Sequence, residues 1–454
     1  MPVELSTEEM WEAIEKNCCI PGYPTEYIMK RKHWPIYVEG HGIYLTDTEG
    51  RDYIDATSGF MCVTLGHGNK KVIEAIKEQL DKLQYVLPGR NAASIKLCRR
   101  IAEVTPGDLN HVLLGLCGSD ANEEALSLAR QYFKNRGKPN SIIVSQWYSY
   151  HGQTLDAASI TGVSGAMKAT HGRDVASTNR GVYHIAAPYC YRCDYDMEYP
   201  ACGIQCAKAL DVLARNMGAE NIAAFVGEPV LGSSGSVSPP PEYYPMIRQI
   251  CDDHGFLLIM DEVMTGWGRT GEVFACNHWN VVPDIMTTAK GLSSAYLPVA
   301  AVAFRDHVND EFRGQAFPYG GHTHSCYPPG AAGALAAIDV LMEERLWENA
   351  AKVGDHLKDR LERISEESEI VGAVHGMGLH LGLEIVEDKA RKKPGRRLAA
   401  AIVAKCEEKG VLTMREEPSL IPIVPPLIIT AKEADHLCDV LSEAIKETEA
   451  AKRK

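Results

Sequence analysis

The sequence predicts an α/β fold, with a large domain built on a mostly parallel central sheet and a smaller α+β domain at the C-terminus. Short apolar runs bounded by turns alternate with helical patterns over most of the chain. Strands that are apolar along their whole length are typical of a parallel sheet covered by helices on both faces. From about Gly330 onwards long helical stretches predominate, which indicates the smaller domain. The 454 residues are enough for two such domains.

The expected elements follow in chain order. A hairpin pattern, Ile43–Leu45 and Tyr53–Ile54, surrounds the turn Asp47–Gly50 near the N-terminus. Five apolar runs are the expected strands of the large sheet: His111–Leu116, Ser141–Val144, Ile222–Val226, Phe256–Met260 and the less regular Leu297–Phe304. The helix after the first run carries its apolar residues on one face: Ala125, Leu128, Ala129, Tyr132 and Phe133. Short strands of the C-terminal domain are expected near Leu379–Ile385 and Leu427–Ile429.

These patterns divide the chain into three parts, with no repeat or long Pro/Gly linker between them. Residues 1–75 are an N-terminal segment that we expect to pack with the small domain. Residues 76–335 are expected to form the large domain and residues 336–454 the small C-terminal domain.

Composition excludes several classes of protein. The formal net charge of -13 disfavours nucleic acid, whose phosphates need basic patches. The longest apolar runs fall far short of the roughly 20 residues that span a bilayer. Residues 1–16 are acidic and amphipathic, unlike a signal or transit peptide. The 14 cysteines are scattered rather than arranged as a disulfide framework, so we expect a cytoplasmic protein.

Two polar segments follow expected strands, where ligands bind in open α/β sheets. Gly118-Ser119 opens a helix, and the free N–H groups and helix dipole at such a point bind anions. A serine there is more often a simple helix cap. Asp261 ends a buried strand and is costly unless it meets a cation such as a protonated pyridine nitrogen. A capping aspartate is the alternative interpretation.

Two further segments complete the candidate site. Lys290 lies in a stretch with little charge, as a lysine that forms a Schiff base requires, although most lysines are solvated surface charges. Tyr150, in Tyr150-His151-Gly152, could stack on a flat ring, although most tyrosines are simply packed in a core. Together, at successive strand ends, the four segments indicate one cofactor, pyridoxal phosphate.

The chain resembles the class III aminotransferases, the ornithine, 4-aminobutyrate and ω-amino-acid:pyruvate branch of fold type I pyridoxal-phosphate enzymes. The resemblance runs from about Tyr37 to Ala444 and is most specific over Phe256–Gly271, followed by Pro283-Asp284 and Ala289-Lys290-Gly291. The interval from Asp261 to Lys290, 290 − 261 = 29, is the family's usual spacing.

The resemblance implies a role for each matching residue. Lys290 would carry the cofactor covalently and move a proton, and Asp261 would pair with the ring nitrogen. The other implied cofactor contacts are Gly118, Ser119, Tyr150, His151, Glu228 and Val263. Thr323 matches the threonine that reaches the phosphate of the partner subunit, which implies a homodimer. Cys117, Ala295 and Cys326 depart from the family's usual residues without removing an essential chemical group.

The resemblance also bears on substrates. Arg415 matches the mobile arginine of ω-amino-acid:pyruvate aminotransferases, which grips a carboxylate; an arginine paired with Glu416 or Glu417 at the surface is the alternative. Phe60 and Met61 match positions that line the substrate pocket, with Tyr150, and Trp147 is a further candidate. The expected reaction moves an amino group from an ω-amino acid or primary amine to a small 2-oxo acid, pyruvate before 2-oxoglutarate, by a ping-pong mechanism.

Three alternatives stay open at this point. One is a decarboxylating transaminase resembling dialkylglycine decarboxylase, which has a glutamine where this chain has Phe60, and the second is an amino-acid epimerase. The third comes from another class of protein, a zinc-binding scaffold without activity. Its four thiolates would be Cys190, Cys193, Cys202 and Cys206, although free cysteines also behave as small hydrophobes, so we expect no metal.

Overall fold

The computed structural model describes residues 5–20, 34–138, 140–163, 181–315 and 319–453. Its centre is a seven-stranded sheet in the order β4-β10-β9-β8-β7-β5-β6. Its strands are β4 (His111–Gly115), β5 (Ile142–Gln146), β6 (Val182–Ile185), β7 (Ile222–Gly227), β8 (Leu257–Asp261), β9 (Ile285–Thr288) and β10 (Ala300–Phe304). The strands from β7 to β10 are buried along their whole length, whereas Tyr183 in the edge strand β6 is exposed. β10 is antiparallel to both of its neighbours and the other pairs are parallel, which confirms the predicted mostly parallel sheet.

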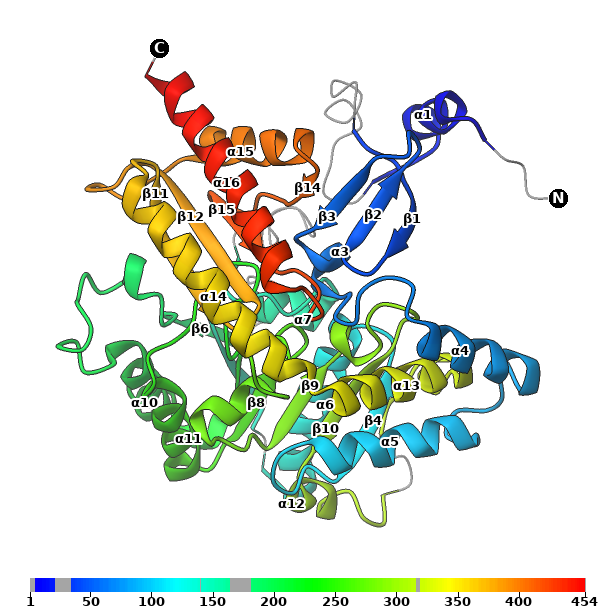
Figure 1. The fold of residues 1–454 in the computed structure, drawn as a ribbon. Coiled ribbons are helices and arrows are strands. Elements are labelled where there is room, and N and C mark those ends of the chain that lie inside the picture. The colour runs from blue at the N-terminus through cyan, green and yellow to red at the C-terminus, as the bar shows by residue number, and fades with distance from the viewer. Residues whose placement is uncertain (1–4, 21–33, 139, 164–180, 316–318, 454) are drawn as a thin grey trace.

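Helices pack against this sheet (Figure 1). α13 (Pro328–Glu344) packs on α4 (Lys70–Lys82) and on α5 (Ala92–Val104), and α12 (Asp306–Asp310) follows β10. The helices that contact the strands are α5, α6 (Gly118–Asn135), α7 (Leu155–Ile160), α10 (Gln205–Met217) and α11 (Tyr243–His254). The central one is α6, which contacts β4 and each strand from β7 to β10. The five residues predicted to share its apolar face are all buried, so that prediction is confirmed. The expected boundary between residues 335 and 336 falls inside α13, which packs on α4 and α5.

A second sheet joins the N-terminal segment to the C-terminal part of the chain. It contains β1 (Tyr37–His41), β2 (Tyr44–Asp47), β3 (Asp52–Asp55) and β14 (Val411–Leu412), in that order. β1 to β3 form an antiparallel meander that includes the predicted hairpin, whereas β14 pairs with β3 in parallel, Val411 opposite Ile54. The short α3 (Ser58–Met61) follows β3, and α1 (Thr7–Lys16) precedes the meander.

The C-terminal part has its own sheet of β11 (Val371–Met377), β12 (His380–Asp388), β13 (Lys393–Pro394) and β15 (Leu420–Ile423). Its helices are α14 (Leu346–Glu367), α15 (Arg396–Glu408) and α16 (Ala431–Lys452). β12 includes the strand expected at 379–385. The strand expected at Leu427–Ile429 is wrong, because those residues form a buried turn. The preceding Pro425 and Pro426 have no N–H group to donate to a strand ladder.

Short 3-10 helices connect several of these elements: η1 (Cys190–Arg192), η2 (Ala219–Asn221), η3 (Ala275–Trp279) and η4 (Lys290–Leu292). In the part of the chain that the structure describes, no helix is both long and apolar enough to cross a membrane.

Candidate active site

A cavity of about 610 Å³ lies where the parallel strands of the large sheet end. Asp261 is the last residue of β8, Glu228 comes directly after β7, and Lys290 comes two residues after β9. Ten residues predicted from the sequence line this cavity: Phe60, Met61, Gly118, Ser119, Tyr150, His151, Glu228, Asp261, Val263 and Lys290. Phe60 and Glu417, which are 417 − 60 = 357 residues apart in sequence, thus meet at one place.

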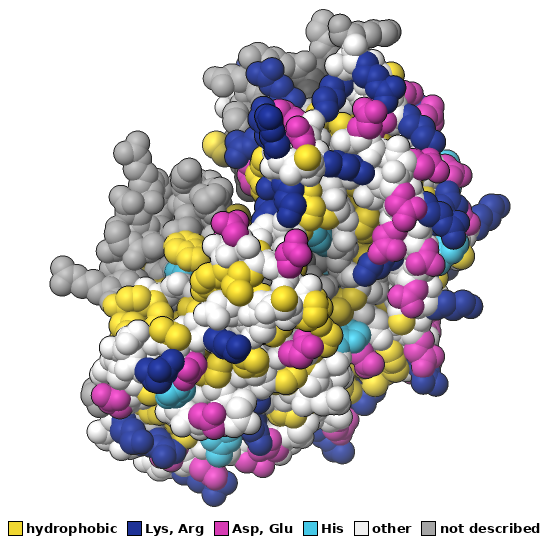
Figure 2. All heavy atoms as spheres, turned by 90° about the vertical axis from the view of Figure 1, so that its left-hand side faces the viewer, with side chains coloured by type: hydrophobic (Ala, Val, Ile, Leu, Met, Phe, Trp, Pro, Cys, Tyr) yellow, Lys and Arg dark blue, Asp and Glu magenta, His cyan; other side chains and the backbone are white. Residues whose placement is uncertain are grey.

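A larger cavity of about 1560 Å³ adjoins the first and shares Val163 and Glu417 with it. Trp147 lines this neighbour, not the first cavity, and stacks on His184 with 4.5 Å between the ring centroids. Hydrophobic side chains gather on this face of the molecule, as Figure 2 shows; the exposed ones include Tyr195 and Val212. The larger cavity contains neither Lys290 nor Asp261, so the chemistry is expected in the smaller one.

Asp261 is only 3% exposed and is held by three donors. The side-chain amide of Asn122 donates to its Oδ2 at 2.7 Å, and the Nδ1 of His151 lies 2.7 Å from the same oxygen. The backbone N–H of Val263 donates to Oδ1 at 2.9 Å. Asn122 is fixed in turn by Thr287, whose hydroxyl donates to its Oδ1 at 2.9 Å. These contacts fix the orientation of a buried carboxylate, which can then meet a cationic ring nitrogen in the cavity.

Lys290 stands in a backbone conformation that is unusual for a residue with a side chain. Its φ is +37°, and it opens η4 directly after Ala289. Such a conformation costs about 1–3 kcal/mol and persists only where the surroundings impose it, often at functional sites. The neighbouring strand residue Thr288 accepts a hydrogen bond from the indole N–H of Trp267, which helps to fix the end of β9.

The start of α6 is open toward the cavity. Its N-cap residue, Cys117, makes no side-chain capping bond, so the N–H groups of the first turn are not satisfied by a cap. The interpretation of Ser119 as that cap is wrong, because Ser119 lies inside α6. A Cβ on Gly118 would lie 2.8 Å from Val263, and one on Gly152 would lie 2.3 Å from the Ser119 hydroxyl oxygen. Only glycine allows this close approach, and the resulting pocket at a helix N-terminus suits a phosphate.

Glu228 is buried beside this pocket. The backbone N–H of Tyr150 donates to its Oε1 at 2.7 Å, and that of Gly232 donates to its Oε2 at 3.0 Å. Burial raises the pKa of Glu228 to about 7, although His151 and the two N–H groups act in the opposite direction. Glu228 therefore positions Tyr150 and is close to half protonated at neutral pH.

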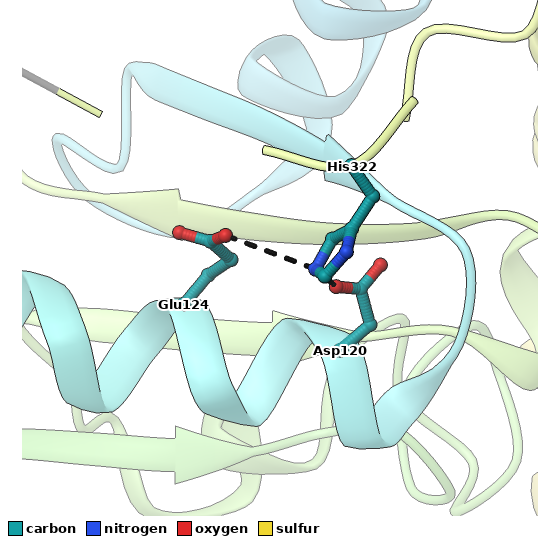
Figure 3. Close-up of side chains that lie close together, drawn as sticks. All are labelled: Asp120, Glu124 and His322. Atoms are coloured by element: carbon teal, nitrogen blue, oxygen red, sulfur yellow. Dashed lines mark ion pairs between the residues drawn. The ribbon is translucent and has the colours of Figure 1, made fainter. Parts of the chain in front are cut away.

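Thr323 lies outside this cavity. It lines a separate cleft of about 850 Å³, and the Tyr85 hydroxyl donates to its carbonyl oxygen. The adjacent His322 forms an ion pair with Asp120 on α6, and its Nε2 is 4.0 Å from Glu124 (Figure 3). Among the described residues these three are the one group whose possible metal-ligand atoms lie within 4.8 Å of one another. The ion pair fastens the loop that carries Thr323 to the first turns of α6.

Arg415 also lies outside the cavity lining, although Met414, Glu416 and Glu417 all belong to it. The Nη1 of Arg415 is 2.8 Å from Oε1 of Glu417, so the guanidinium forms the surface pair that the sequence left as an alternative. Phe60 is 67% exposed at the cavity wall, and Met61 is buried against Met264. The substrate-facing wall is thus largely apolar.

Two residues of the site were not found from the sequence. Asn122 lies one turn into α6. Its sequence signal is a polar residue at a helix position that faces the ends of the strands. Glu416 has no sequence signal beyond its place next to Arg415. Its Oε2 atom is shielded from solvent and has no hydrogen-bond partner among the described residues.

The four cysteines considered for zinc do gather at one point. Cys190, Cys193, Cys202 and Cys206 all line a cavity of about 20 Å³ between η1 and α10. All of them are free thiols, and burial raises the pKa of Cys206 to about 12. They are not within the 4.8 Å spacing of ligand atoms that the Asp120 group meets, so they do not form a closed metal site in this conformation.

Comparison with known proteins agrees with this geometry. The family described as aminotransferase class-III matches residues 28–445. A putrescine–pyruvate aminotransferase of Pseudomonas aeruginosa is 32% identical over 448 residues, which cover 97% of each chain. A leucine/methionine racemase of Thermococcus litoralis is 34% identical over 419 residues, which cover 91% of each chain.

A solved structure gives the same result for the fold. The amine transaminase of an uncultivated Pseudomonas species, in a pyridoxal-phosphate-bound form, matches with a TM-score of 0.89 at 33% identity, over 95% of this chain and 99% of that one. Fold type I and dependence on pyridoxal phosphate, both expected from the sequence, are thereby confirmed. The chain belongs to the class III aminotransferases, the family that its lysine, its strand-end aspartate and its open helix terminus indicated.

Proposed function

We propose that this enzyme transfers an amino group from a primary amine or ω-amino acid to pyruvate or a similar small 2-oxo acid by a ping-pong mechanism. One observation carries the proposal: Lys290, Asp261 and the open start of α6 meet in a single cavity with an apolar wall. The similarity to the putrescine–pyruvate aminotransferase of Pseudomonas aeruginosa supports it.

The residues present fit the cofactor. Pyridoxal phosphate, when bound, supplies an electron sink that stabilises negative charge on the carbon bearing the amino group. Gly118 and Ser119 would hold its phosphate, and Tyr150 and Val263 would enclose its ring. Asp261, held by His151 and Asn122, would keep the ring nitrogen protonated. The Nζ of Lys290 would bind the cofactor and later carry the proton to and from the substrate carbon.

Arg415 would serve the second half of the reaction. A guanidinium can grip the carboxylate of a 2-oxo acid with two hydrogen bonds, but here it is paired with Glu417. To reach the cavity it would exchange this partner for the substrate, and the exchange replaces one ion pair with another. The Arg415 guanidinium would thus bind the carboxylate of the oxo acid. It would stay paired with Glu417 when the substrate is an amine that has no α-carboxylate.

Decarboxylation is disfavoured by the cavity wall, whereas racemisation stays as a second candidate function. Phe60 offers no donor to a carboxylate at the cavity wall, so a carboxylate placed there would lose its hydration without a partner. Racemisation would move a proton to either face of one carbon, and the similarity to the Thermococcus litoralis racemase keeps it as the second candidate.

We further propose a cytoplasmic homodimer in which Thr323 of each subunit contacts the cofactor phosphate of the other. The position of Thr323 outside its own chain's cavity supports the exchange, since the loop can then reach a neighbouring site. The 14 free cysteines support a reducing compartment.

The test is an assay of the purified enzyme with amine donors and pyruvate, in which alanine is measured. We expect Lys290→Ala to bind the cofactor but to lose turnover by at least about a thousandfold, because the amine is both anchor and proton carrier. Retention of activity within tenfold would contradict the role of Lys290. Racemisation of an amino acid without any alanine from the amines, or CO₂ release from 2-aminoisobutyrate, would replace transamination by the corresponding alternative.

A further inference from the structure

Glu416 brings a carboxyl oxygen without a hydrogen-bond partner into the candidate active site. It lines the same cavity as Lys290 and Glu228, next to the apolar Met414. Its Oε2 atom is shielded from solvent and accepts no hydrogen bond from any described residue. Buried carboxyl oxygens are normally satisfied, so an unsatisfied one at a ligand cavity needs an explanation.

Among the described residues, no cation lies within ion-pair distance of the Glu416 carboxyl. The neighbouring acid, Glu417, contrasts with it, because Glu417 has Arg415 at 2.8 Å and Arg396 at 2.9 Å. The charged side chains that act on Glu416 are Lys290, which favours its ionised form, and Glu228, which opposes it. Lys290 is the residue assigned to the cofactor in the proposed function, so it would not serve as a permanent partner.

We propose that Glu416 is the recognition site for a second ammonium group, and that the preferred donors are diamines or longer polyamines. This inference rests on the proposed function, because one amino group of the donor reacts beside Lys290 while the other pairs with Glu416. Methylene groups between the two ends would pass along the apolar wall that includes Met61 and Met414. Charge-assisted hydrogen bonds of an ammonium to a shielded carboxylate are among the stronger polar contacts in proteins.

The protonation of Glu416 makes this arrangement compatible with both halves of the reaction. Burial raises the pKa of Glu416 to about 8, with Glu228 acting in the same direction and Lys290 and the N–H of Gly235 against it. At neutral pH the carboxyl is therefore mostly neutral while no ligand is present, and it does not repel the carboxylate of an oxo acid. A distal ammonium favours the ionised form, so binding of the donor releases a proton.

The experiment compares three donors with the same four-carbon chain and different far ends: butane-1,4-diamine, butylamine and 4-aminobutyrate. A fourth donor, pentane-1,5-diamine, tests the preferred chain length. Each is assayed as holoenzyme with pyruvate for the wild type, Glu416→Gln, Glu416→Asp and the control Glu366→Gln. Glu366 is an exposed residue of α14 that faces solvent. Absorbance of the bound cofactor and far-ultraviolet circular dichroism check that each variant is folded and loaded.

For the wild type and the control we expect kcat/KM to be highest for the diamine and lowest for 4-aminobutyrate, whose far end is negative. Glu416→Gln is expected to lower the ratio of diamine to butylamine by about tenfold or more, mainly through KM. Glu416→Asp keeps the charge on a shorter stem, so it should keep the preference for a distal ammonium. Its optimum should move from butane-1,4-diamine toward pentane-1,5-diamine.

The outcomes separate this inference from the function on which it rests. Equal use of the diamine and butylamine by the wild type, or an unchanged ratio in Glu416→Gln, overturns the role of Glu416 and leaves transamination intact. Absence of alanine with every donor overturns the proposed function itself. If Glu416→Gln does not fold, Glu416→Asp and the donor series on the wild type decide the question, because a structural role would not shift the preferred chain length.

Discussion

Two buried carboxylates of the site illustrate how surroundings set the chemistry of one functional group. Asp261 accepts hydrogen bonds from Asn122, His151 and a backbone N–H, three donors that suit an ionised group. Glu228 has two backbone N–H groups and is otherwise dominated by burial, which raises its pKa to about 7. Glu228 is thus a carboxyl whose charge can change near neutral pH.

The raised pKa of Glu228 predicts a pH dependence of stability. In the folded protein Glu228 holds its proton up to about pH 7, whereas the reference value is 4.5, so the folded state binds more protons between these values. Its contribution to stability is therefore complete at low pH and is lost as the pH rises through about 7. The shift corresponds to about 3 kcal/mol.

For the cofactor-free protein we expect the melting temperature of Glu228→Gln, relative to the wild type, to be higher at pH 9 than at pH 5. A difference independent of pH, as expected for the control Glu366→Gln, would contradict the assigned protonation.

Lys290 and Asp261 could be predicted from the sequence because each follows an apolar strand and because their spacing matches a family. Glu416 and Asn122 could not, since their significance depends on what surrounds them. The carboxyl of Glu416 is significant because its Oε2 atom has no hydrogen-bond partner among the described residues, and the amide of Asn122 because Asp261 and Thr287 come from strands more than 130 residues further along the chain. Such relations exist only after the elements have been brought together.

Arg269 connects elements of the large and the C-terminal parts. Its guanidinium is completely buried, and Nη1 donates to the carbonyl oxygens of Leu379 at 3.1 Å and Pro425 at 2.5 Å. Nη2 donates to the hydroxyl of Ser58 at 3.3 Å. Burial without a contacting carboxylate lowers the pKa of Arg269 to about 9. A charge is tolerated there because it satisfies carbonyl groups from segments that would otherwise be left without donors.

Replacement of Arg269 is expected to loosen this junction. Arg269→Met keeps much of the volume but leaves the Leu379 and Pro425 carbonyls unsatisfied, which costs about 1–3 kcal/mol for each buried group. We expect faster thermal inactivation and a melting temperature several degrees lower. Arg305→Met, which removes a half-exposed arginine at the other end of the large sheet, is the matched control. An equal decrease in melting temperature for the two substitutions would show that the contacts of Arg269 stabilise the protein no more than those of Arg305.

The predicted strands differ in how well the sequence marked them. β7 and β8 are continuous apolar runs, and both were predicted within one or two residues. β9 and β6 were missed, because each has only four residues and β9 includes two threonines, so neither rises above its surroundings. The buried run at Leu427–Ile429 was wrongly predicted as a strand. An apolar run indicates that a segment is buried, but it does not show that the backbone of the segment pairs with another strand. Prolines can prevent such pairing.

In the proposed homodimer, the position of Thr323 would bring it to the cofactor site of the partner subunit. The loop is fastened to α6 through His322 and Asp120, close to the start of a helix that would hold a phosphate. Thr323 itself lines the separate cleft of about 850 Å³. A threonine hydroxyl held in this way can complete the phosphate site of a second subunit placed against that cleft.

Two measurements check the exchange between subunits. Sedimentation is expected to give a mass of about twice the 49.8 kDa of the chain. Thr323→Ala is expected to raise the dissociation constant for pyridoxal phosphate by about tenfold, since one hydrogen bond to a charged group contributes about 1.5–3 kcal/mol. The mass should stay the same. A monomeric wild type, or unchanged cofactor affinity in a dimeric variant, would exclude a contribution of Thr323 across the interface.

The parallel pairing of β3 with β14 also governs the order in which the newly made chain can fold. The meander at residues 37–55 leaves the ribosome early, but the edge of β3 receives its partner only after residues 411 and 412 have been synthesised (Figure 1). At about 5–20 residues per second, that edge stays open for tens of seconds. An open strand edge can pair with other chains during this interval, so this meander is most prone to aggregation before β14 has been made.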